Sequence, residues 1–376
     1  MDGDGLTAFL RMPRLLYDGL EGFVPRLDFA ERQALDPKRA PFFRHGIAHY
    51  WTAWRDGKPV GRISAQIDRL QTEPYGMFGC LDAVDDPQVV ALLLGQAEKW
   101  LTERGMTACR GPFTLSINGE SGLLTDGQGA PPTTLMGWNP AYLEKHVIST
   151  GYNRAKVLLA YGLDLKGVDA AALLQAVKTP KLLPSVSLRT LKLGNLDSEC
   201  EIIARVYNDA WRRNWGFVPI TTDEVTTLAH AFRPMLVPEC GIIVELDGEP
   251  IAVALILPNL AELTGDFGGK LLPFAWARLL WRMLRKDYRS GRLALFGVAE
   301  RYRMSILGSA IPLAIIGEYI RYSRKYGLSQ LELSWVLEDN AGARSVVEKM
   351  GAKITKHYSI LEKTISASPV RLPSHE

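Results

Sequence analysis

Apolar and polar residues alternate in two short regions of the chain, and a turn dipeptide divides each region. Alternation with a period of two is typical of a half-buried strand, and an Asp-Gly pair between two such strands is typical of a tight hairpin. The two regions lie 191 residues apart and have the same order of features. The sequence predicts β-hairpins at residues 46–63, around Asp56-Gly57, and at residues 242–253, around Asp247-Gly248.

A helix that ends at a glycine and leads into a strand follows each hairpin. Glycine is favoured just after a helix because it enters the left-handed backbone conformation without a steric penalty. A last helix and a closing hairpin then complete each copy of the plan. A hairpin followed by such crossovers predicts an α/β fold, with two tandem mixed sheets flanked by helices. The crossover helices are predicted at 87–104 and 309–326, and the closing segments at 139–164 and 340–363.

The two copies are joined by a segment with a different character. A short helix is predicted at residues 169–178, and Pro180 and Pro184 mark a linker after it. We therefore expect a degenerate N-terminal domain at 1–168, a linker at 169–186, and a C-terminal domain at 187–376.

The composition agrees with a folded globular protein. The 376 residues are 47% hydrophobic and 23% charged, and the net charge of +3 is too small for a protein that covers nucleic acid with its whole surface. Four cysteines without a Cys-x-x-Cys pair exclude a zinc knuckle and a disulfide framework, and His45 and His49 lie too far apart along a strand to share a metal ion. Neither a secretory signal nor a membrane-spanning run of about 18 apolar residues is expected.

One segment concentrates the positive charge of the chain. Residues 270–292 contain seven basic residues and one acidic residue, and the arginines recur at helical spacing beside tryptophans. A helix packed on the body with its basic face in water is one interpretation. We favour an amphipathic helix on an anionic membrane surface, because two tryptophans lie on one short segment, and this predicts a cytoplasmic protein peripheral to the inner membrane. The residues expected at the membrane are Trp276, Arg278, Trp281, Arg282, Arg285 and Arg289.

Residues 298–308, Val-Ala-Glu-Arg-Tyr-Arg-Met-Ser-Ile-Leu-Gly, lie between a predicted strand and a predicted helix. The segment resembles the acyl-CoA loop of the GNAT acyltransferases, Gln/Arg-x-x-Gly-x-Gly/Ala, with Ile306 in place of the first glycine. The resemblance implies that the pyrophosphate of the donor, acyl-CoA, lies at the N-terminus of the following helix, where the dipole is positive. The residues so implied in donor binding are Val298, Arg301, Arg303, Gly308, Ser309 and Asn340.

The first copy differs at the corresponding position. It has Asp82, Asp85 and Asp86 where the loop would lie, and carboxylates repel a pyrophosphate. We therefore expect one acyl-CoA site, in the second copy. On the last helix, Val347 stands where many GNAT proteins have a catalytic tyrosine, so no tyrosine acid is expected there.

Several longer runs are similar to the bacterial ceramide synthases and their GNAT relatives. The runs include Arg110-Gly111-Pro112, residues 116–124 and residues 207–219. The resemblance covers nearly the whole chain and implies transfer of a fatty acyl group from acyl-CoA to the amine of a sphingoid base, a lipid acceptor. Two alternatives stay open: a tandem-GNAT aminoacyl transferase of the FemABX type, and a lipid-binding protein without catalytic activity.

Candidate catalytic residues are polar groups in unusual surroundings. Asn118 and Glu120 lie in a glycine-rich loop that either converges on a substrate amine or is a solvated turn. Glu332 lies on a largely apolar strand, on the face opposite Trp335, and either a buried salt bridge or a general base explains it. His357 is a further candidate proton carrier.

Aromatic residues complete the candidate site. Such residues usually belong to a core, and in a lipid enzyme they also wall an acyl tunnel. We expect a neutral amine to attack the thioester directly, because no Cys or Ser lies in a nucleophile motif. The backbone N–H near Val298 is expected to stabilise the oxyanion, and no metal is required. The aromatic candidates are Trp211, Trp215, Phe217, Trp335 and Tyr358.

Overall fold

The computed structural model describes residues 3–168 and 186–365, so the predicted linker helix at 169–178, Pro180 and Pro184 lie outside the described residues. The elements of the first copy are α1 (Gly3–Tyr17), α2 (Asp28–Leu35), η1 (Pro41–Arg44), β1 (Gly46–Arg55), β2 (Lys58–Asp68), β3 (Tyr75–Ala83), α3 (Pro87–Thr102), β4 (Ala108–Gly111), β5 (Leu123–Asp126), α4 (Tyr142–Ser149) and β6 (Asn153–Asp164).

The second copy follows a similar order, with an additional first strand and an additional helical hairpin and without a counterpart of β5 among the described residues. Its elements are β7 (Val186–Thr190), η2 (Leu193–Asn195), α6 (Leu196–Trp211), α7 (Thr222–Phe232), η3 (Pro238–Cys240), β8 (Gly241–Leu246), β9 (Glu249–Pro258), α8 (Leu260–Thr264), η4 (Gly265–Phe267), α9 (Ala275–Arg285), β10 (Ser290–Val298), α10 (Glu300–Arg303), α11 (Ile306–Tyr326), β11 (Gln330–Leu337), α12 (Ala341–Lys349) and β12 (Lys353–Thr364).

Both predicted hairpins are present, as β1–β2 and β8–β9. The turn residues Asp56 and Asp247 have φ of 49° and 51°, and the glycine after each also has a positive φ. Two consecutive residues with positive φ form the turn whose twist matches paired strands, and Asp-Gly adopts it readily. The two turn dipeptides therefore determine both hairpins locally.

The expected mixed α/β architecture is confirmed, but the strands form one continuous sheet. Its order is β1-β2-β3-β4-β12-β6-β11-β10-β9-β8-β7, and β5 pairs with β12. The last strand of each copy lies beside the other copy: β12 pairs with β4, and β6 pairs with β11. The centre of the sheet is therefore built from both copies, and the boundaries drawn at 1–168 and 187–376 stay a prediction.

The closing hairpins predicted for each copy were wrong. Residues 153–164 and 353–364 are single twelve-residue strands, β6 and β12, which pair antiparallel with each other. The sequence analysis expected each strand to pair across a tight turn within its own copy, but each pairs with the last strand of the other copy instead. Hydrophobic periodicity predicts a strand but does not identify its neighbour, because a strand from elsewhere in the chain satisfies the same backbone groups.

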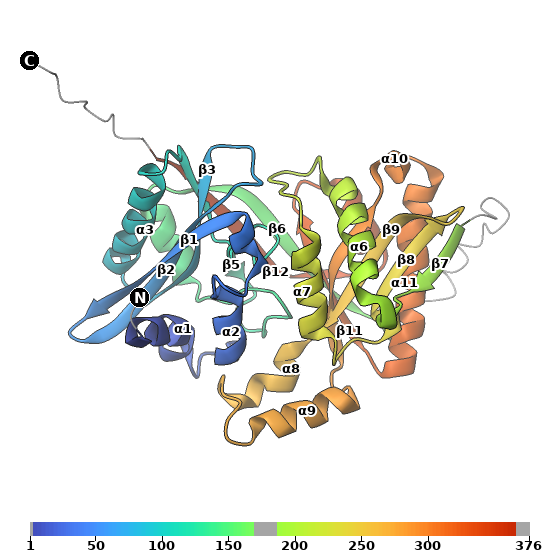
Figure 1. Ribbon diagram of the computed structural model, residues 1–376, viewed down its shortest axis with the longest axis horizontal. Helices are drawn as coiled ribbons and strands as arrows, with labels where there is room; N and C mark the ends of the chain where they lie inside the picture. The colour runs from blue at the N-terminus through green and yellow to red at the C-terminus, as the bar shows by residue number, and fades with distance from the viewer. Residues whose placement is uncertain (1–2, 169–185, 366–376) are drawn as a thin grey trace, which may run out of the picture.

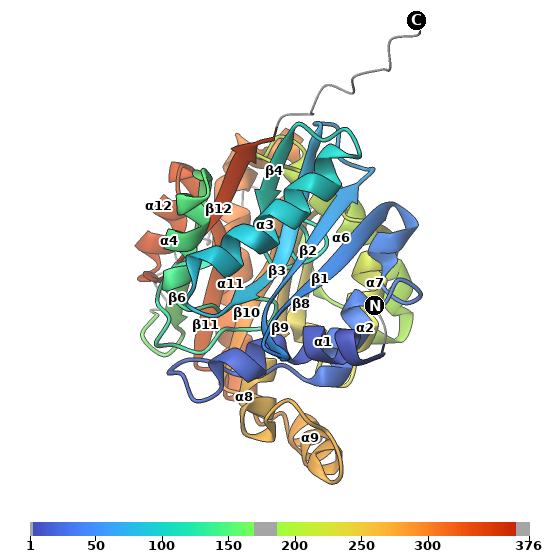
Figure 2. The same ribbon diagram turned by 90° about the vertical axis from the view of Figure 1, so that its left-hand side faces the viewer.

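Helices cover both faces of the sheet. Figures 1 and 2 show α1, α2, α6 and α7 on one face and α3, α4, α11 and α12 on the other. The helical hairpin of α8 and α9 projects from one end of the molecule, beside α1 and α2. The two views therefore place the central strands in the core and leave α9 at the periphery.

The parallel pairs β3–β4 and β10–β11 lie at equivalent positions in the two copies, but the two strands of each pair are arranged differently at one end. Strands β10 and β11 pair only from Ser290–Leu293 to Gln330–Leu333, although β10 stays paired with β9 to Val298 and β11 with β6 to Leu337, so the two strands separate beyond Leu293 and Leu333. This divergence defines an opening between β10 and β11. In the first copy the chain after β4 continues the pairing, since Phe113 N–H donates to the Phe78 carbonyl at 2.8 Å.

Candidate active site

The loop at residues 298–308, which the sequence analysis expects to bind the donor, joins strand β10 to helix α11. Gly308 lies in the first turn of α11, where a Cβ would be 2.2 Å from the carbonyl O of Arg303. The side chain of Ser305 caps α11 by accepting from Gly308 N–H. This close approach explains why a glycine occupies position 308, and it brings the positive end of a 21-residue helix to the loop.

The two loop arginines have partners on the protein. Arg301 is exposed and pairs with Glu249 at 2.5 Å, and Arg303 donates to the Ala210 carbonyl at 3.1 Å. Ser309 follows Gly308 at the exposed start of α11. The loop therefore presents two guanidinium groups near the helix N-terminus.

Val298 ends β10 beside the opening. Ala299 N–H donates to the Ile251 carbonyl at 2.8 Å, and Val298 lies opposite Ala252 in the same antiparallel pair. Hydrogen-bonded and non-hydrogen-bonded residue pairs alternate along such a ladder, so the N–H of Val298 points away from β9. It therefore points to the side of the opening.

Helix α3, the equivalent helix of the first copy, has different residues at its N-terminus. Asp86 caps α3 by accepting from Gln88 N–H at 2.8 Å and pairs with Arg55, and Asp85 lies 2.6 Å from His146. Carboxylates thus occupy the N-terminus of α3, whereas a serine occupies that of α11. The expectation of one donor site stays a prediction.

A buried polar network lies at the base of the opening. Glu332 Oε1 accepts from the hydroxyls of Thr133 at 2.6 Å and Ser334 at 2.9 Å, and Glu332 Oε2 lies 3.3 Å from Lys356 Nζ. Glu332, Ser334 and Lys356 are all buried. One cation and two hydroxyl donors therefore compensate the Glu332 carboxylate for the loss of contact with water.

Arg292 extends this network on β10. It is buried, donates through Nε to the Ser334 hydroxyl at 2.9 Å, and stacks its guanidinium 4.5 Å from the centre of the Trp335 ring. Burial lowers the pKa of Arg292, and the charges of Glu332 and Glu120 partly offset this effect. Two buried cations therefore flank the carboxylate of Glu332.

The expected position of Trp335 was wrong. Strict alternation placed it opposite Glu332, but its ring stacks on the arginine that binds Ser334, so it belongs to the same cluster. The register of β11 shifts between Leu333 and Val336, and such an irregularity breaks the alternation of side chains.

The glycine-rich loop after β4 brings Glu120 and Asn118 to this face. Glu120 pairs with Arg26, and Asn118 Nδ2 donates to the Val218 carbonyl at 3.1 Å. Burial raises the pKa of Tyr358 well above its usual value, and Glu332 and Glu120 raise it further. The same loop packs on Tyr358 through Gly122, where a Cβ would lie 2.9 Å from the Cβ of the tyrosine.

The aromatic candidates do not all meet. Tyr358, Trp335 and Trp215 belong to one apolar cluster between the copies. Trp211 instead stacks on Tyr207 and donates to the Phe296 carbonyl at 2.8 Å, and Phe217 lies half-buried in the α6–α7 connection.

The remaining candidates occupy separate places. His357 lies between Lys356 and Tyr358 on β12, so its side chain points to the opposite face, where Nδ1 is 3.3 Å from Asp126. Asn340 caps α12 by accepting from Ala343 N–H. Among residues 3–168 and 186–365, no three His, Cys, Asp or Glu side chains come together as metal ligands.

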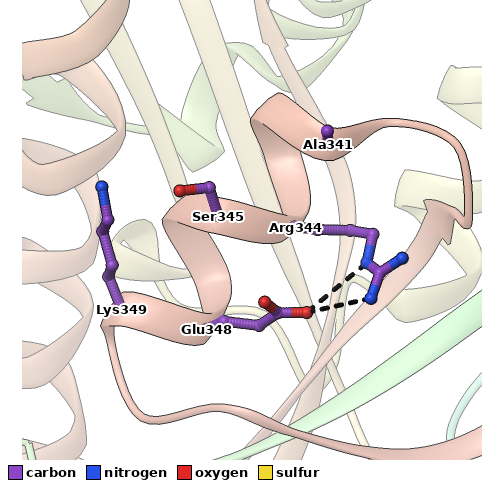
Figure 3. A pocket seen from close by; sticks show the side chains of 5 residues that line it. All are labelled: Ala341, Arg344, Ser345, Glu348 and Lys349. Carbon is purple, nitrogen blue, oxygen red and sulfur yellow. Dashed lines mark hydrogen bonds and ion pairs between the residues drawn. The ribbon is translucent and has the colours of Figure 1, made fainter.

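A surface hollow of about 470 Å³ lies along α12. Figure 3 shows Arg344 on one side of the helix, joined to Glu348, and Ser345 and Lys349 on the other. Ala341 completes the lining. The hollow begins just after the Asn340 cap, so it borders the segment that the family resemblance assigned to the donor.

Several apolar side chains of the amphipathic helix α9 and of the residues just before it lie on the exterior, and we call them the apolar side of α9, whereas Leu279 and Met283 pack against the core. Phe274, Leu272 and Leu284 are 80%, 77% and 72% exposed, and Trp276, Leu280 and Trp281 are also exposed. On the basic side, Arg278 and Arg282 both pair with Asp266, and Arg285 stacks on Trp281. Arg289 is exposed beyond the helix. Within the described ranges, no helix is both long and apolar enough to span a membrane.

Sequence reasoning missed Lys356, Arg292, Thr133 and Arg26. A carboxylate on an apolar strand requires a buried partner, so Glu332 signalled that such a cation exists. The sequence could not identify it, because Lys356 reaches Glu332 only after β12 crosses into the centre of the sheet.

Comparisons with known proteins agree on one family. A protein named bacterial ceramide synthase from Caulobacter vibrioides (strain NA1000 / CB15N) is 38% identical over 366 residues, covering 96% of this chain and 95% of that protein. Protein YghO from Escherichia coli (strain K12) is 35% identical over 369 residues, covering 97% and 94%. No protein-family model matches the chain.

The solved structures confirm the tandem GNAT fold. A tandem GNAT protein from the clavulanic acid biosynthesis pathway has a TM-score of 0.58 at 14% identity and covers 98% of this chain and 97% of its own. The chain therefore belongs to the family of the bacterial ceramide synthase and YghO, and it is an acyltransferase with a tandem GNAT fold.

Proposed function

We propose that the protein transfers a fatty acyl group from acyl-CoA to the amine of a sphingoid long-chain base. The observation that carries the proposal is the buried Glu332 network at the base of the opening between β10 and β11. The relative named bacterial ceramide synthase, 38% identical, supports the substrate class. The exposed apolar side of α9 supports a lipid acceptor.

The donor would lie along the opening, with its phosphates at the α10–α11 turn. Arg301, Arg303, Gly308 and Ser309 offer guanidinium groups, a backbone turn and a helix N-terminus, which fit an anion. Arg301 would exchange its exposed partner Glu249 for a phosphate. The N–H of Val298 would donate to the thioester oxygen as negative charge develops there.

The reaction requires a neutral amine as the nucleophile and a basic group that accepts one proton. The amine nitrogen forms the C–N bond at the thioester carbon, the C–S bond breaks, and CoA leaves as a thiolate. The proton of the new ammonium group passes to the Glu332 carboxylate, through Ser334 or a water molecule. Lys356 would hold that carboxylate in position directly, and Arg292 would do so through the Ser334 hydroxyl.

Membrane docking would place the acceptor. A sphingoid base remains in a bilayer through its hydrocarbon chain, so an enzyme that acts on it benefits from binding the bilayer surface. The apolar side of α9 would enter the interface, while the adjacent arginines contact anionic headgroups. This arrangement makes the protein a peripheral enzyme of the inner membrane.

The test supplies the purified protein with palmitoyl-CoA, a saturated sphingoid base and phospholipid vesicles. Release of CoA thiol together with an N-acyl product in mass spectrometry would support the proposal. Arg303→Glu should abolish both signals, and the matched change Asp86→Lys in the first copy should preserve them. CoA binding without thiol release would favour a non-catalytic lipid-binding protein. Acylation from aminoacyl-tRNA alone would favour the FemABX type.

A further inference from the structure

The segment between α1 and α2, residues 18–27, packs against residues 123–138, which include Thr133 of the candidate site. We call it the strap. A Cβ on Gly22 would lie 1.9 Å from the Gln128 carbonyl O, so the two backbones are in close contact. The Phe23 ring lies 5.2 Å from that of Trp138. The strap is therefore held against the loop at residues 123–138.

The other side of the strap is held by the base of the membrane hairpin. Asp28 N–H, just after the strap, donates to the Gly269 carbonyl at 2.9 Å, and Arg14 donates to the Gly268 carbonyl at 2.7 Å. A Cβ on Gly269 would lie 2.7 Å from the Arg26 carbonyl O. Arg26 thus lies directly beside the turn that leads into α9, as the position of α9 below α1 and α2 in Figure 2 illustrates.

Arg26 bridges two carboxylates. One guanidinium nitrogen pairs with Glu120 and the other lies 2.9 Å from Glu31. Burial alone would lower the pKa of Arg26, but Glu120 and Glu31 outweigh it and raise the pKa. The Arg26 side chain is 40% exposed and that of Glu120 is 16% exposed. A guanidinium that leaves Glu120 therefore still has Glu31 and access to water.

We propose that Arg26 is a resident counter-ion on Glu120, and that the ammonium group of the acceptor displaces it. Glu120 is then the carboxylate that receives the headgroup of a long-chain amine, and Arg26 sets the selectivity of that step. The inference rests on the proposed function for the identity of the acceptor. Glu120 binds the acceptor as its ammonium, which releases one proton to water at this partly exposed carboxylate before the neutral amine attacks. Glu332 accepts the second proton, which the amine loses during the transfer.

Three observations support this exchange. The loop that carries Glu120 packs on β12, since a Cβ on Gly122 would lie 2.9 Å from the Cβ of Tyr358, and Lys356 of the Glu332 network lies two residues before Tyr358 on that strand. Through Arg26, the strap connects Glu120 to the base of the hairpin that carries α9. A lipid whose tail lies at α9 would therefore have its headgroup on the side of Glu120. Displacement by an ammonium also keeps one positive charge on Glu120, which avoids a buried uncompensated carboxylate.

The test measures binding of decylammonium and of decanol, which share a chain length and differ in charge, by calorimetry on the full chain. Arg26→Met should strengthen decylammonium binding about tenfold, since the competitor is gone, and should leave decanol binding unchanged. Arg26→Lys should restore wild-type affinity. Arg55→Met is the matched control, because the Arg55–Asp86 pair is similarly exposed, at 51% and 22%, and it should change neither affinity.

Glu120→Gln gives the decisive comparison. It should abolish the preference for decylammonium over decanol, and the double variant with Arg26→Met should show no gain. A gain that persists without Glu120, or an Arg26→Met variant that binds decylammonium no better than wild type at an unchanged melting temperature, would overturn the proposal. Because acyl-CoA is absent from this assay, a failure of acyl transfer would leave its result standing.

Discussion

The exposed apolar side of α9 predicts that membrane binding depends on hydrophobic insertion more than on charge. The perturbation is a triple variant, Leu272→Ser, Phe274→Ser and Leu284→Ser. These side chains are 72% to 80% exposed, so almost their full apolar surface is available for transfer into a bilayer. At about 1.5 kcal/mol for each side chain, the variant should lose about 4.5 kcal/mol of binding free energy, a reduction in partitioning of about a thousandfold.

The basic side should contribute less than its four arginines suggest. Each cation near an anionic surface is worth about 1 kcal/mol, but Arg278 and Arg282 share Asp266, so the net contribution is about 3 kcal/mol at low salt. Neutralising Arg278, Arg282, Arg285 and Arg289 should weaken binding to anionic vesicles and leave binding to zwitterionic vesicles unchanged. The arginine contribution should also disappear at high ionic strength.

Vesicle sedimentation measures both effects. The control variant carries Leu92→Ser and Ile148→Ser, which change exposed apolar residues on α3 and α4, away from the hairpin. It should bind as the wild type does. If the triple variant on the α9 hairpin also bound as the wild type does, the apolar side would not enter the membrane, and the reasoning would be refuted.

Other substitutions test the donor loop, the buried carboxylate and a buried thiol. Gly308→Ala should weaken CoA binding about tenfold in calorimetry, because its Cβ would collide with a backbone carbonyl. Gly95→Ala is the control: its Cβ has open space on the corresponding helix of the first copy, so it should have no effect. Equal losses in the two variants would contradict a single donor site. Glu332→Gln should lower kcat about a hundredfold at unchanged CoA affinity, and an unchanged kcat would limit Glu332 to a structural ion pair. Burial raises the pKa of Cys109 from 9.0 to about 12, so the stability from its protonated thiol is present below pH 9 and is lost as the pH rises toward 12. Urea unfolding between about pH 7.5 and about pH 10.5 should show wild type losing about 2 kcal/mol more than Cys109→Ala, and parallel profiles would exclude this linkage.

The sequence by itself determined the features that depend on neighbours along the chain. The Asp-Gly turns fix their hairpins because two adjacent residues accept positive φ. The glycine after α11 ends that helix in the left-handed conformation, as expected. The tight turn at Gly308 and the amphipathic pattern of α9 are equally local.

The tertiary structure alone decided which distant segments meet. Strand pairing satisfies backbone groups without regard to their place in the sequence. The last strand of each copy, β6 or β12, could therefore pair within the other copy, although the sequence predicted a hairpin inside each copy. That pairing brings Lys356 to Glu332, and the irregularity in β11 brings Trp335 to Arg292. Packing likewise chose which side of α9 faces outward, because a helix with apolar and basic sides carries no information about the surface that receives it.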